Sequence, residues 1–262
     1  MVAPGQWGAM MRLKGKIAWV TGAGSGIGEA AALALAEEGA TIVLCGRTAE
    51  KLERVATRIK SAGGTTHVQA ADLTHAAEAE RVGAYIQKTL GRLDILVNNA
   101  GTNVQNRAWS KLTAAGASEV IQGNLASAFY CVTVALPIMR GQKDGVMIHT
   151  ASLAGRNISL LGGPAYSAAK HGVVAMSHSI NMEECQNGIR STAVCPGEVV
   201  TPIFDKRPRP PTPEECARMV QPEDCGELIK YIACLPPRVC LNEVWISPTW
   251  NRGYIEAQQT RR

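Results

Sequence analysis

Along residues 16–98, short apolar runs alternate with longer segments whose apolar residues recur at helical spacing. The runs are continuous and rich in β-branched residues, which predicts strands buried on both faces. They are Ile17–Thr21, 41–45, Thr66–Ala70 and 95–97. Helices are predicted over 27–38, from Leu52 to the glycine pair at 63–64, and over Ala76–Leu90. This order predicts an α/β fold, in which helices cover both faces of a parallel sheet.

The second half continues the pattern. We predict a long helix over 118–139, a strand at 146–150, a helix over 165–184, a strand at 191–195, a helix over Pro222–Ala233 and a last strand at 244–246. The four prolines within 207–213 exclude regular helix and central strand there, so we expect a stiff, exposed loop. We expect one domain over 13–249, with residues 1–12 and 252–262 as flexible termini.

Composition adds mainly exclusions. Lys and Arg outnumber Asp and Glu by only 27 to 22 and are scattered, which argues against a nucleic-acid partner. The eight cysteines form no Cys-x-x-Cys pair, so we expect reduced thiols and no metal site. Neither a secretory signal nor a run of about 20 apolar residues is present, so we expect a cytoplasmic protein that binds no membrane.

A glycine-rich turn follows the first predicted strand and opens into a helix. Its residues are Gly22, Gly24, Ser25, Gly26, Ile27 and Gly28. Glycines let the chain turn tightly and bring backbone N–H groups against a pyrophosphate, and the helix N-terminus favours negative charge. The alternative is a tight loop that binds nothing.

Tyr166 and Lys170 stand four residues apart on a predicted helix, so they share one face. A cation beside a phenol stabilises the phenolate, and we expect it to lower the pKa of Tyr166 towards neutrality. A phenol tuned in this way suits general acid/base catalysis.

Several spaced motifs together resemble the short-chain dehydrogenase/reductase family over roughly 13–246. They are the turn at 21–28, Asn-Asn-Ala-Gly at 98–101, Ser152, the Tyr166–Lys170 pair and Pro-Gly-Glu-Val-Val-Thr at 196–201. The resemblance implies a Rossmann-like doubly wound sheet. It also implies an NAD(P)-dependent oxidoreductase that moves a hydride between nicotinamide and a secondary alcohol or ketone. A dinucleotide-binding sensor without catalysis and an isomerising relative are the alternatives.

The resemblance also implies roles for single residues. Tyr166 would exchange the proton with the substrate oxygen, and Lys170 would tune it and bind the nicotinamide ribose. Asn124 would support a proton relay through water, unless it only satisfies its own helix. Ser152 would orient the substrate oxygen, with Thr150 and Ser159 as fallback hydroxyls.

Further positions match cofactor-binding positions of the family. Asp72 would contact adenine, although an Asp that caps a turn looks the same. The remaining positions, which would line the adenine, ribose and nicotinamide parts of the site, are Leu73, Asn99, Ala100, Gly101, Pro196, Gly197, Val199 and Thr201.

The second strand indicates which dinucleotide is preferred. Gly46 stands where an NAD-preferring member carries a carboxylate, and Arg47 follows it. A guanidinium there suits the 2'-phosphate of NADP, so we expect NADP to be preferred over NAD. The alternative is a solvent-facing Arg47 near Glu50. Ser25 stands where some NADP-specific relatives place a second cation, so the preference is expected to be modest.

Two regions depart from the family pattern. The proline-rich segment at 207–213 would form a compact lid over the substrate, with a plain linker or a docking segment as alternatives. Residues 242–249 resemble the branch of hydroxy-acid and serine dehydrogenases, which points to a hydroxy-acid or keto-acid substrate. The family resemblance further implies a homo-oligomer, a tetramer or a dimer, in which the helices at 118–139 and 165–184 pair.

Overall fold

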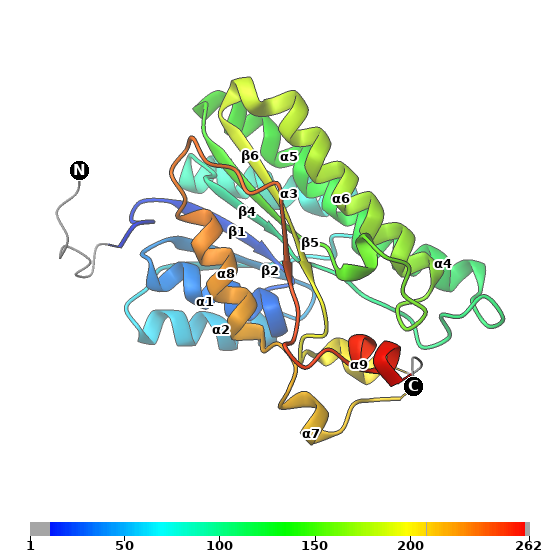
Figure 1. Cartoon of the computed structure of the whole chain (residues 1–262). Helices are drawn as coiled ribbons and strands as arrows, with labels where there is room; N and C mark the ends of the chain where they lie inside the picture. The colour runs from blue at the N-terminus through cyan, green and yellow to red at the C-terminus, as the bar shows by residue number, and fades with distance from the viewer. Residues whose placement is uncertain (1–10, 208, 260–262) are drawn as a thin grey trace.

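The computed structural model describes residues 11–207 and 209–259. Seven parallel strands form one sheet in the order β3-β2-β1-β4-β5-β6-β7 (Figure 1). They are β1 (Ile17–Thr21), β2 (Thr41–Gly46), β3 (Thr66–Ala70), β4 (Ile95–Asn98), β5 (Gly145–Thr150), β6 (Ile189–Pro196) and β7 (Glu243–Ile246). The order reverses between β1 and β4, as in a doubly wound sheet, so the predicted fold class is confirmed.

Helices cover both faces of this sheet. They are α1 (Gly26–Glu37), α2 (Ala49–Ser61), α3 (Ala76–Leu90), α4 (Ala114–Ile121), α5 (Ser127–Gln142), α6 (Pro164–Glu184), α7 (Pro213–Cys216), α8 (Pro222–Ala233) and α9 (Arg252–Gln259). Short helical turns add η1 (Gln122–Ala126), η2 (Leu153–Gly155), η3 (Cys185–Asn187) and η4 (Pro202–Lys206). One core lies between the sheet and α1, α2 and α8, and the other between the sheet and α3, α5 and α6.

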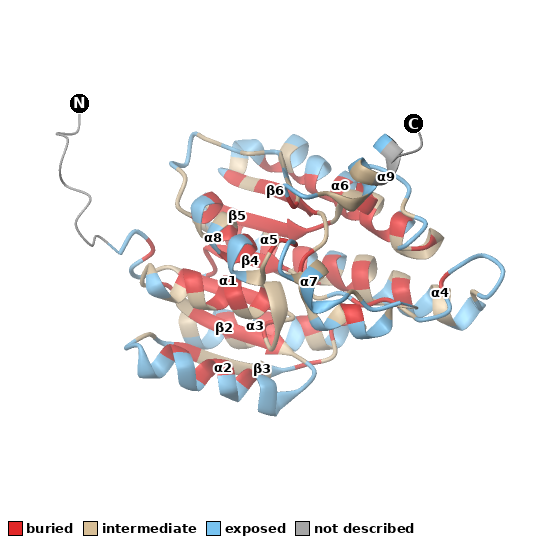
Figure 2. Ribbon diagram, turned by 60° about the horizontal axis from the view of Figure 1, so that its bottom comes forward, coloured by how far each residue is buried: buried red, intermediate tan, exposed pale blue. Residues whose placement is uncertain are grey.

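The continuous apolar strands follow from this two-sided burial. In β1, Trp19 belongs to the core under α3, α5 and α6, whereas Ala18 and Val20 belong to the other core. All three are fully buried, because successive side chains of a strand point to opposite faces. Figure 2 shows the central strands of the sheet buried, while the edge strands β3 and β7 are partly exposed and the helices that cover the sheet are buried along the side that faces it.

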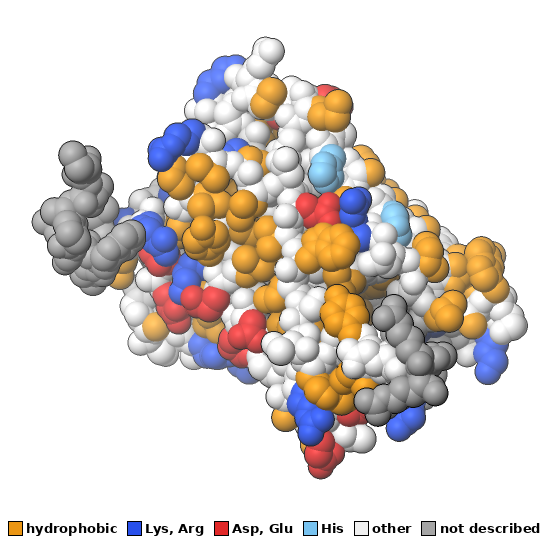
Figure 3. Space-filling model, viewed as in Figure 1, with side chains coloured by type: hydrophobic (Ala, Val, Ile, Leu, Met, Phe, Trp, Pro, Cys, Tyr) orange, Lys and Arg blue, Asp and Glu red, His pale blue; other side chains and the backbone are white. Residues whose placement is uncertain are grey.

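Apolar side chains also remain on the outer surface. Figure 3 shows them gathered over β7 and the chain that joins it to α8. Tyr231, Trp245 and Trp250 are large exposed side chains of this region. Since β7 is the last strand of the sheet, this apolar face covers a sheet edge.

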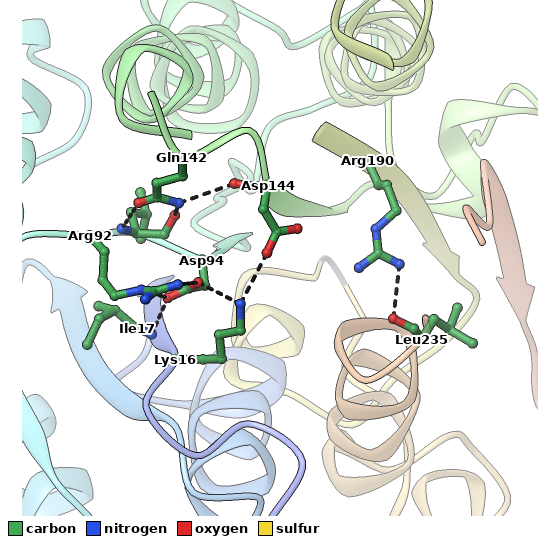
Figure 4. Close-up of polar contacts among 9 residues, drawn as sticks. Lys16, Ile17, Arg92, Asp94, Gln142, Asp144, Arg190 and Leu235 are labelled. Carbon is green, nitrogen blue, oxygen red and sulfur yellow. Dashed lines mark hydrogen bonds and ion pairs between the residues drawn. The ribbon is translucent and has the colours of Figure 1, made fainter. Parts of the chain in front are cut away.

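A polar cluster joins the amino ends of the strands (Figure 4). The buried Asp94 accepts hydrogen bonds from the backbone N–H of Ile17 (2.9 Å), from Arg92 Nε (2.8 Å) and from Lys16 Nζ (3.0 Å). Burial raises the pKa of Asp94, but these hydrogen bonds outweigh it and the net direction is downward. The cluster therefore holds together the amino-terminal ends of β1 and β4, which lie at the end of the sheet opposite the carboxyl ends of the strands.

The predicted helix at 118–139 is longer and interrupted. The helical segment Ala114–Gln142 runs through α4, the π-helical turn η1 and α5. By length and composition alone it could cross a membrane, but Cys131, Ala135 and Met139 on its inner face lie in the core. A buried core helix of a globular protein meets the same criteria.

Two predictions about irregular segments are corrected. The chain after residue 252 is not a loose end through Gln259, because it forms α9 and Arg252 pairs with Glu198 and Glu215. The segment 207–213 is not an exposed loop throughout. The Arg207 side chain is only 11% exposed, and Pro213 begins the short helix α7 behind a capping box at Thr212.

At the other end of the chain, Arg12 pairs with Glu38, so the predicted flexible terminus does not extend to this residue. Residues 1–10 and 260–262 of the predicted termini lie outside the described residues.

Candidate active site

A cleft of about 1180 Å³ opens at the carboxyl ends of the strands. Its walls are the segments that follow β1 to β6, and the reversal of strand order between β1 and β4 lies among them. Every predicted site residue lines this cleft except Gly28. These lining residues are Gly22, Gly24, Ser25, Gly26, Ile27, Arg47, Asp72, Leu73, Asn99, Ala100, Gly101, Asn124, Ser152, Tyr166, Lys170, Pro196, Gly197, Val199 and Thr201.

Thr21, the last residue of β1, ties the segment after β4 to the glycine turn. Its Oγ1 accepts hydrogen bonds from the backbone N–H groups of Asn99 and Ala100, both at 2.9 Å. Asn99 Nδ2 in turn donates to the Thr21 carbonyl at 3.2 Å. Two segments that are far apart in the sequence are therefore locked side by side on the floor of the cleft.

The glycine turn needs its glycines for two physical reasons. Gly22 and Gly26 have φ of 63° and 57°, which favours residues without Cβ. At Gly28 an added Cβ would lie 2.3 Å from the Gly22 carbonyl oxygen and 2.6 Å from Asn99 Nδ2. Gly28 thus permits the close packing of α1 against the turn, although it does not face the cleft.

The first backbone N–H groups of α1 donate no hydrogen bond to a capping side chain at Ser25. Ser25 precedes the helix in an extended conformation and makes no side-chain capping hydrogen bond. The first N–H groups of a helix have no partner within the helix, so they suit an anion in this part of the cleft. Together with the tight turn that the positive φ of Gly22 and Gly26 allows, the residues present fit a dinucleotide pyrophosphate.

Asp72 and Arg47 follow β3 and β2 and line the cleft there. Asp72 Oδ1 accepts hydrogen bonds from the Thr74 backbone N–H (3.1 Å) and from Thr74 Oγ1 (2.8 Å). Asp72 therefore caps a turn, which the sequence analysis gave as the alternative to contact with adenine. Burial raises the pKa of Asp72, but Thr74 and the charge of Arg47 outweigh it, and the net direction is downward. Arg47 is exposed at the rim, so its guanidinium is accessible from the cleft.

Tyr166 and Lys170 lie in the first turns of α6, which begins directly after Gly163. Lys170 is 4% exposed, and its Nζ donates to the Thr150 carbonyl at 2.7 Å and lies 5.7 Å from the centre of the Tyr166 ring. Burial lowers the pKa of Lys170 to about 8. The predicted pairing on one helix face is therefore present.

The predicted direction of the Tyr166 pKa is wrong. Burial raises it, and this effect outweighs the opposing influences of a Ser152 hydrogen bond and the charges of Arg107 and Arg207. The charged groups that oppose this rise most are Arg107 and Arg207. The cations that act on Tyr166 come from other segments of the chain than the helix that carries it.

Ser152 is the hydroxyl that meets Tyr166. It follows β5 in an extended conformation, its Oγ accepts from the Ala154 backbone N–H at 3.1 Å, and it is close enough to Tyr166 to lower the pKa of the phenol. Ser159 Oγ instead accepts from the Gly162 backbone N–H at 2.9 Å. This geometry favours Ser152 over Ser159, one of the two fallback hydroxyls.

Asn124 lies in the π-helical turn η1 and is 1% exposed. Its Nδ2 donates to the carbonyls of Thr102 (2.8 Å) and Val120 (2.7 Å), while its Oδ1 has no partner among the described residues. The bond to Val120 matches the alternative of an Asn that satisfies its own helix. The unpartnered oxygen and the π-turn, which often marks functional sites, leave room for a further role.

The comparisons identify the family. A family model described as short chain dehydrogenase matches residues 16–211, most of the chain. This chain is a member of that family. An uncharacterised oxidoreductase of Staphylococcus aureus (strain MW2) is 35% identical over 91% of this chain and 100% of its own length.

Solved structures agree with the assignment. A metagenomic short-chain oxidoreductase in complex with NADP has a TM-score of 0.80 at 30% identity, covering 92% of this chain and 100% of that one. An alcohol dehydrogenase from the archaeon Thermococcus sibiricus, complexed with 5-hydroxy-NADP, has a TM-score of 0.82 at 25% identity, covering 90% and 98%. This short-chain dehydrogenase is therefore an oxidoreductase that acts on CH–OH groups.

The charged side chains that line the cleft around Tyr166 were not predicted from the sequence. Arg107 is 8% exposed and donates to the carbonyls of Leu161 (3.3 Å) and Lys206. Glu198 accepts hydrogen bonds from Arg207 Nη1 and Arg252 Nε, both at 2.9 Å, which links the proline-rich segment to the start of α9. No local spacing marks these contacts, since the partners are 9 to 99 residues apart.

Proposed function

We propose that this short-chain dehydrogenase works in the cytosol as an NADP(H)-dependent reductase of ketones and dehydrogenase of secondary alcohols. The observation that carries the proposal is that Tyr166 and Ser152 lie beside the buried Lys170 in the same cleft that the glycine turn lines. Bound nicotinamide supplies or accepts the hydride. The protein then has to hold the substrate oxygen and move one proton.

Tyr166 is the proton donor in reduction. Its raised pKa keeps the phenol protonated at neutral pH, which is the form that donates to a developing alkoxide. Ser152 Oγ lies against the phenol and donates a second hydrogen bond to the same substrate oxygen. The buried charge of Lys170 stabilises negative charge at this point, and Asn124 supports the relay that returns a proton to the phenol.

The cofactor lies along the rest of the cleft in this proposal. The glycine turn and the start of α1 hold the pyrophosphate, and Asp72 and Leu73 contact adenine, although Asp72 is also a turn cap. Asn99, Ala100 and Gly101 line the ribose, and Lys170 binds the nicotinamide ribose. The carboxamide end is held by Pro196, Gly197, Val199 and Thr201.

Arg47 gives the preference for NADP(H) over NAD(H). We expect Arg47→Ala to weaken NADP(H) binding by about tenfold, the lower end for a charge-assisted bond, because water screens this exposed side chain. NAD(H) affinity should stay unchanged. Dissociation constants for both dinucleotides, measured on wild type, Arg47→Ala and the remote control Arg238→Ala, test this. Tighter NAD(H) binding by wild type, or an equal loss for both dinucleotides, contradicts the assignment.

The substrate in this proposal is a hydroxy acid or keto acid, as the resemblance of residues 242–249 to that branch implies. The test follows nicotinamide absorbance with a panel of ketones, keto acids and the matching alcohols. Turnover with oxidation of NADPH supports the reductase. Dinucleotide binding without turnover on any member supports the non-catalytic sensor instead.

We also propose that the chain assembles as a homotetramer, with a dimer as the alternative. Exposed apolar side chains support this: Phe129 of α5 is 44% exposed, Met182 of α6 is 82% exposed, and Tyr231 and Trp245 are exposed on α8 and β7. A closed tetramer needs two interfaces, and a dimer needs one. Light scattering at micromolar concentration should give four times the 27.8 kDa of one chain, and a monomer mass would refute the prediction.

A further inference from the structure

The structure assigns Arg107 as the residue that binds a carboxylate of the substrate, so that the enzyme selects ketones or alcohols carrying an acid group near the reacting carbon. This inference rests on the proposed oxidoreductase function and names the side chain that selects the substrate class.

Arg107 is a buried cation without an acidic partner. It is 8% exposed, and its hydrogen bonds reach only the carbonyls of Leu161 and Lys206, while Nε has no partner among the described residues. Burial and the neighbouring charge of Arg207 lower its pKa. A buried charge is costly unless it is paired, so this guanidinium favours an anion from the cleft that it lines.

Three other cations at this end of the cleft, Arg207, Arg252 and Lys206, already have acids. Arg207 Nη1 lies 2.9 Å from Glu198 Oε1, and its guanidinium lies 3.7 Å from the Phe204 ring centre. Arg252 pairs with Glu198 and Glu215, and Lys206 Nζ lies 3.7 Å from a Glu119 carboxylate oxygen. All three of these carboxylates are therefore engaged. Among the described residues at this end of the cleft, Arg107 is the buried guanidinium without an acid, whereas Arg209, which also lines the cleft, is exposed to water.

Arg107 also lies at the right end of the cleft. Leu161 belongs to the segment after β5, and Lys206 ends η4 after β6, so Arg107 bridges the two segments that flank Tyr166. Its charge is among those that act on the Tyr166 phenol. Arg47 and Asp72, by contrast, follow β2 and β3 on the proposed adenine side.

Local backbone geometry holds Arg107 in place. Gly163 has φ of 83°, and a Cβ there would lie 2.5 Å from the Arg107 carbonyl oxygen and 2.9 Å from its Cβ. This glycine lets the Arg107 segment pack against the start of α6, three residues before Tyr166. A carboxylate bound by the Arg107 fork would accordingly be positioned relative to the catalytic phenol and hydroxyl.

Apolar side chains also line this end of the cleft, among them Ile158, Leu161, Ile203 and Phe204. A buried cation beside apolar side chains suits a small acid with a hydrocarbon body.

The experiment compares keto acids with their methyl esters, which keep the shape and lose the charge. For wild type we expect kcat/KM to favour the acid, and Arg107→Met to lower kcat/KM for the acid by about ten- to a hundredfold. For the ester, kcat/KM should differ between wild type and Arg107→Met by less than about threefold, which is close to the error of comparing two variants. Arg107→Lys keeps the charge without the fork and should retain an intermediate activity on the acid. Arg238→Met serves as the remote control.

Binding separates this inference from the proposed function. Calorimetric titration of the acids and esters into dinucleotide-saturated wild type and Arg107→Met needs no turnover. Selective loss of acid binding supports the assignment even if no substrate turns over. Equal losses for acid and ester, or wild type that prefers esters, overturn it and leave Arg107 as a clamp between two loops. Thermal melting confirms that each variant is folded, and Arg107→Lys provides the test if Arg107→Met is not.

Discussion

Tyr166→Phe should retain less than about a tenth of wild-type turnover, because the substitution removes the only proposed proton donor and keeps the ring. The side chain is half-buried and lies within reach of Ser152 and the charges of Arg107 and Arg207, and the phenylalanine ring has no group that can donate a proton. Affinity for NADP(H) should change little, since Lys170 and the glycine turn remain. Steady-state kinetics on the best substrate of the panel and a binding titration measure the two quantities.

Tyr231→Phe is the matched control for this loss. Tyr231 is 55% exposed on α8, so the same removal of a hydroxyl should leave kcat and KM at wild-type values. Retention of more than about a tenth of the activity by Tyr166→Phe would assign the proton to another group.

The second large effect is expected for Gly28→Ala. The new Cβ would lie 2.3 Å from the Gly22 carbonyl oxygen, and backbone at that distance has to move. The shift displaces α1 from the glycine turn, so we expect affinity for both dinucleotides to fall at least about tenfold and stability to fall by about 1–3 kcal/mol. Binding titrations and thermal or denaturant unfolding measure the two losses.

Gly141→Ala provides the contrast. Gly141 lies within α5, and an added Cβ would meet nothing within 4 Å. Alanine favours the helix, so this variant should bind dinucleotide normally and be slightly more stable, by about 0.5–1 kcal/mol. Equal behaviour of the two variants would show that the packing at Gly28 does not support the cofactor site.

The sequence by itself determined the sheet, the glycine turn and the Tyr166–Lys170 pair. These features depend on near neighbours: strands buried on both faces are continuous apolar runs, and residues four apart share a helix face. The bounds of β1 and β3 were predicted to the residue. The carboxyl ends of parallel strands meet at one edge, so motifs that follow successive strands were expected to meet, and all but Gly28 line one cleft.

Only the tertiary structure decided the charges around that cleft. Arg107 reaches Lys206 across 99 residues, and Arg252 reaches Glu198 across 54, so no periodicity within a segment encodes either contact. The pKa of Tyr166 was predicted in the wrong direction for the same reason. Spacing along a helix places Lys170 near the ring, but the burial that dominates the pKa comes from segments that pack over it from elsewhere in the chain.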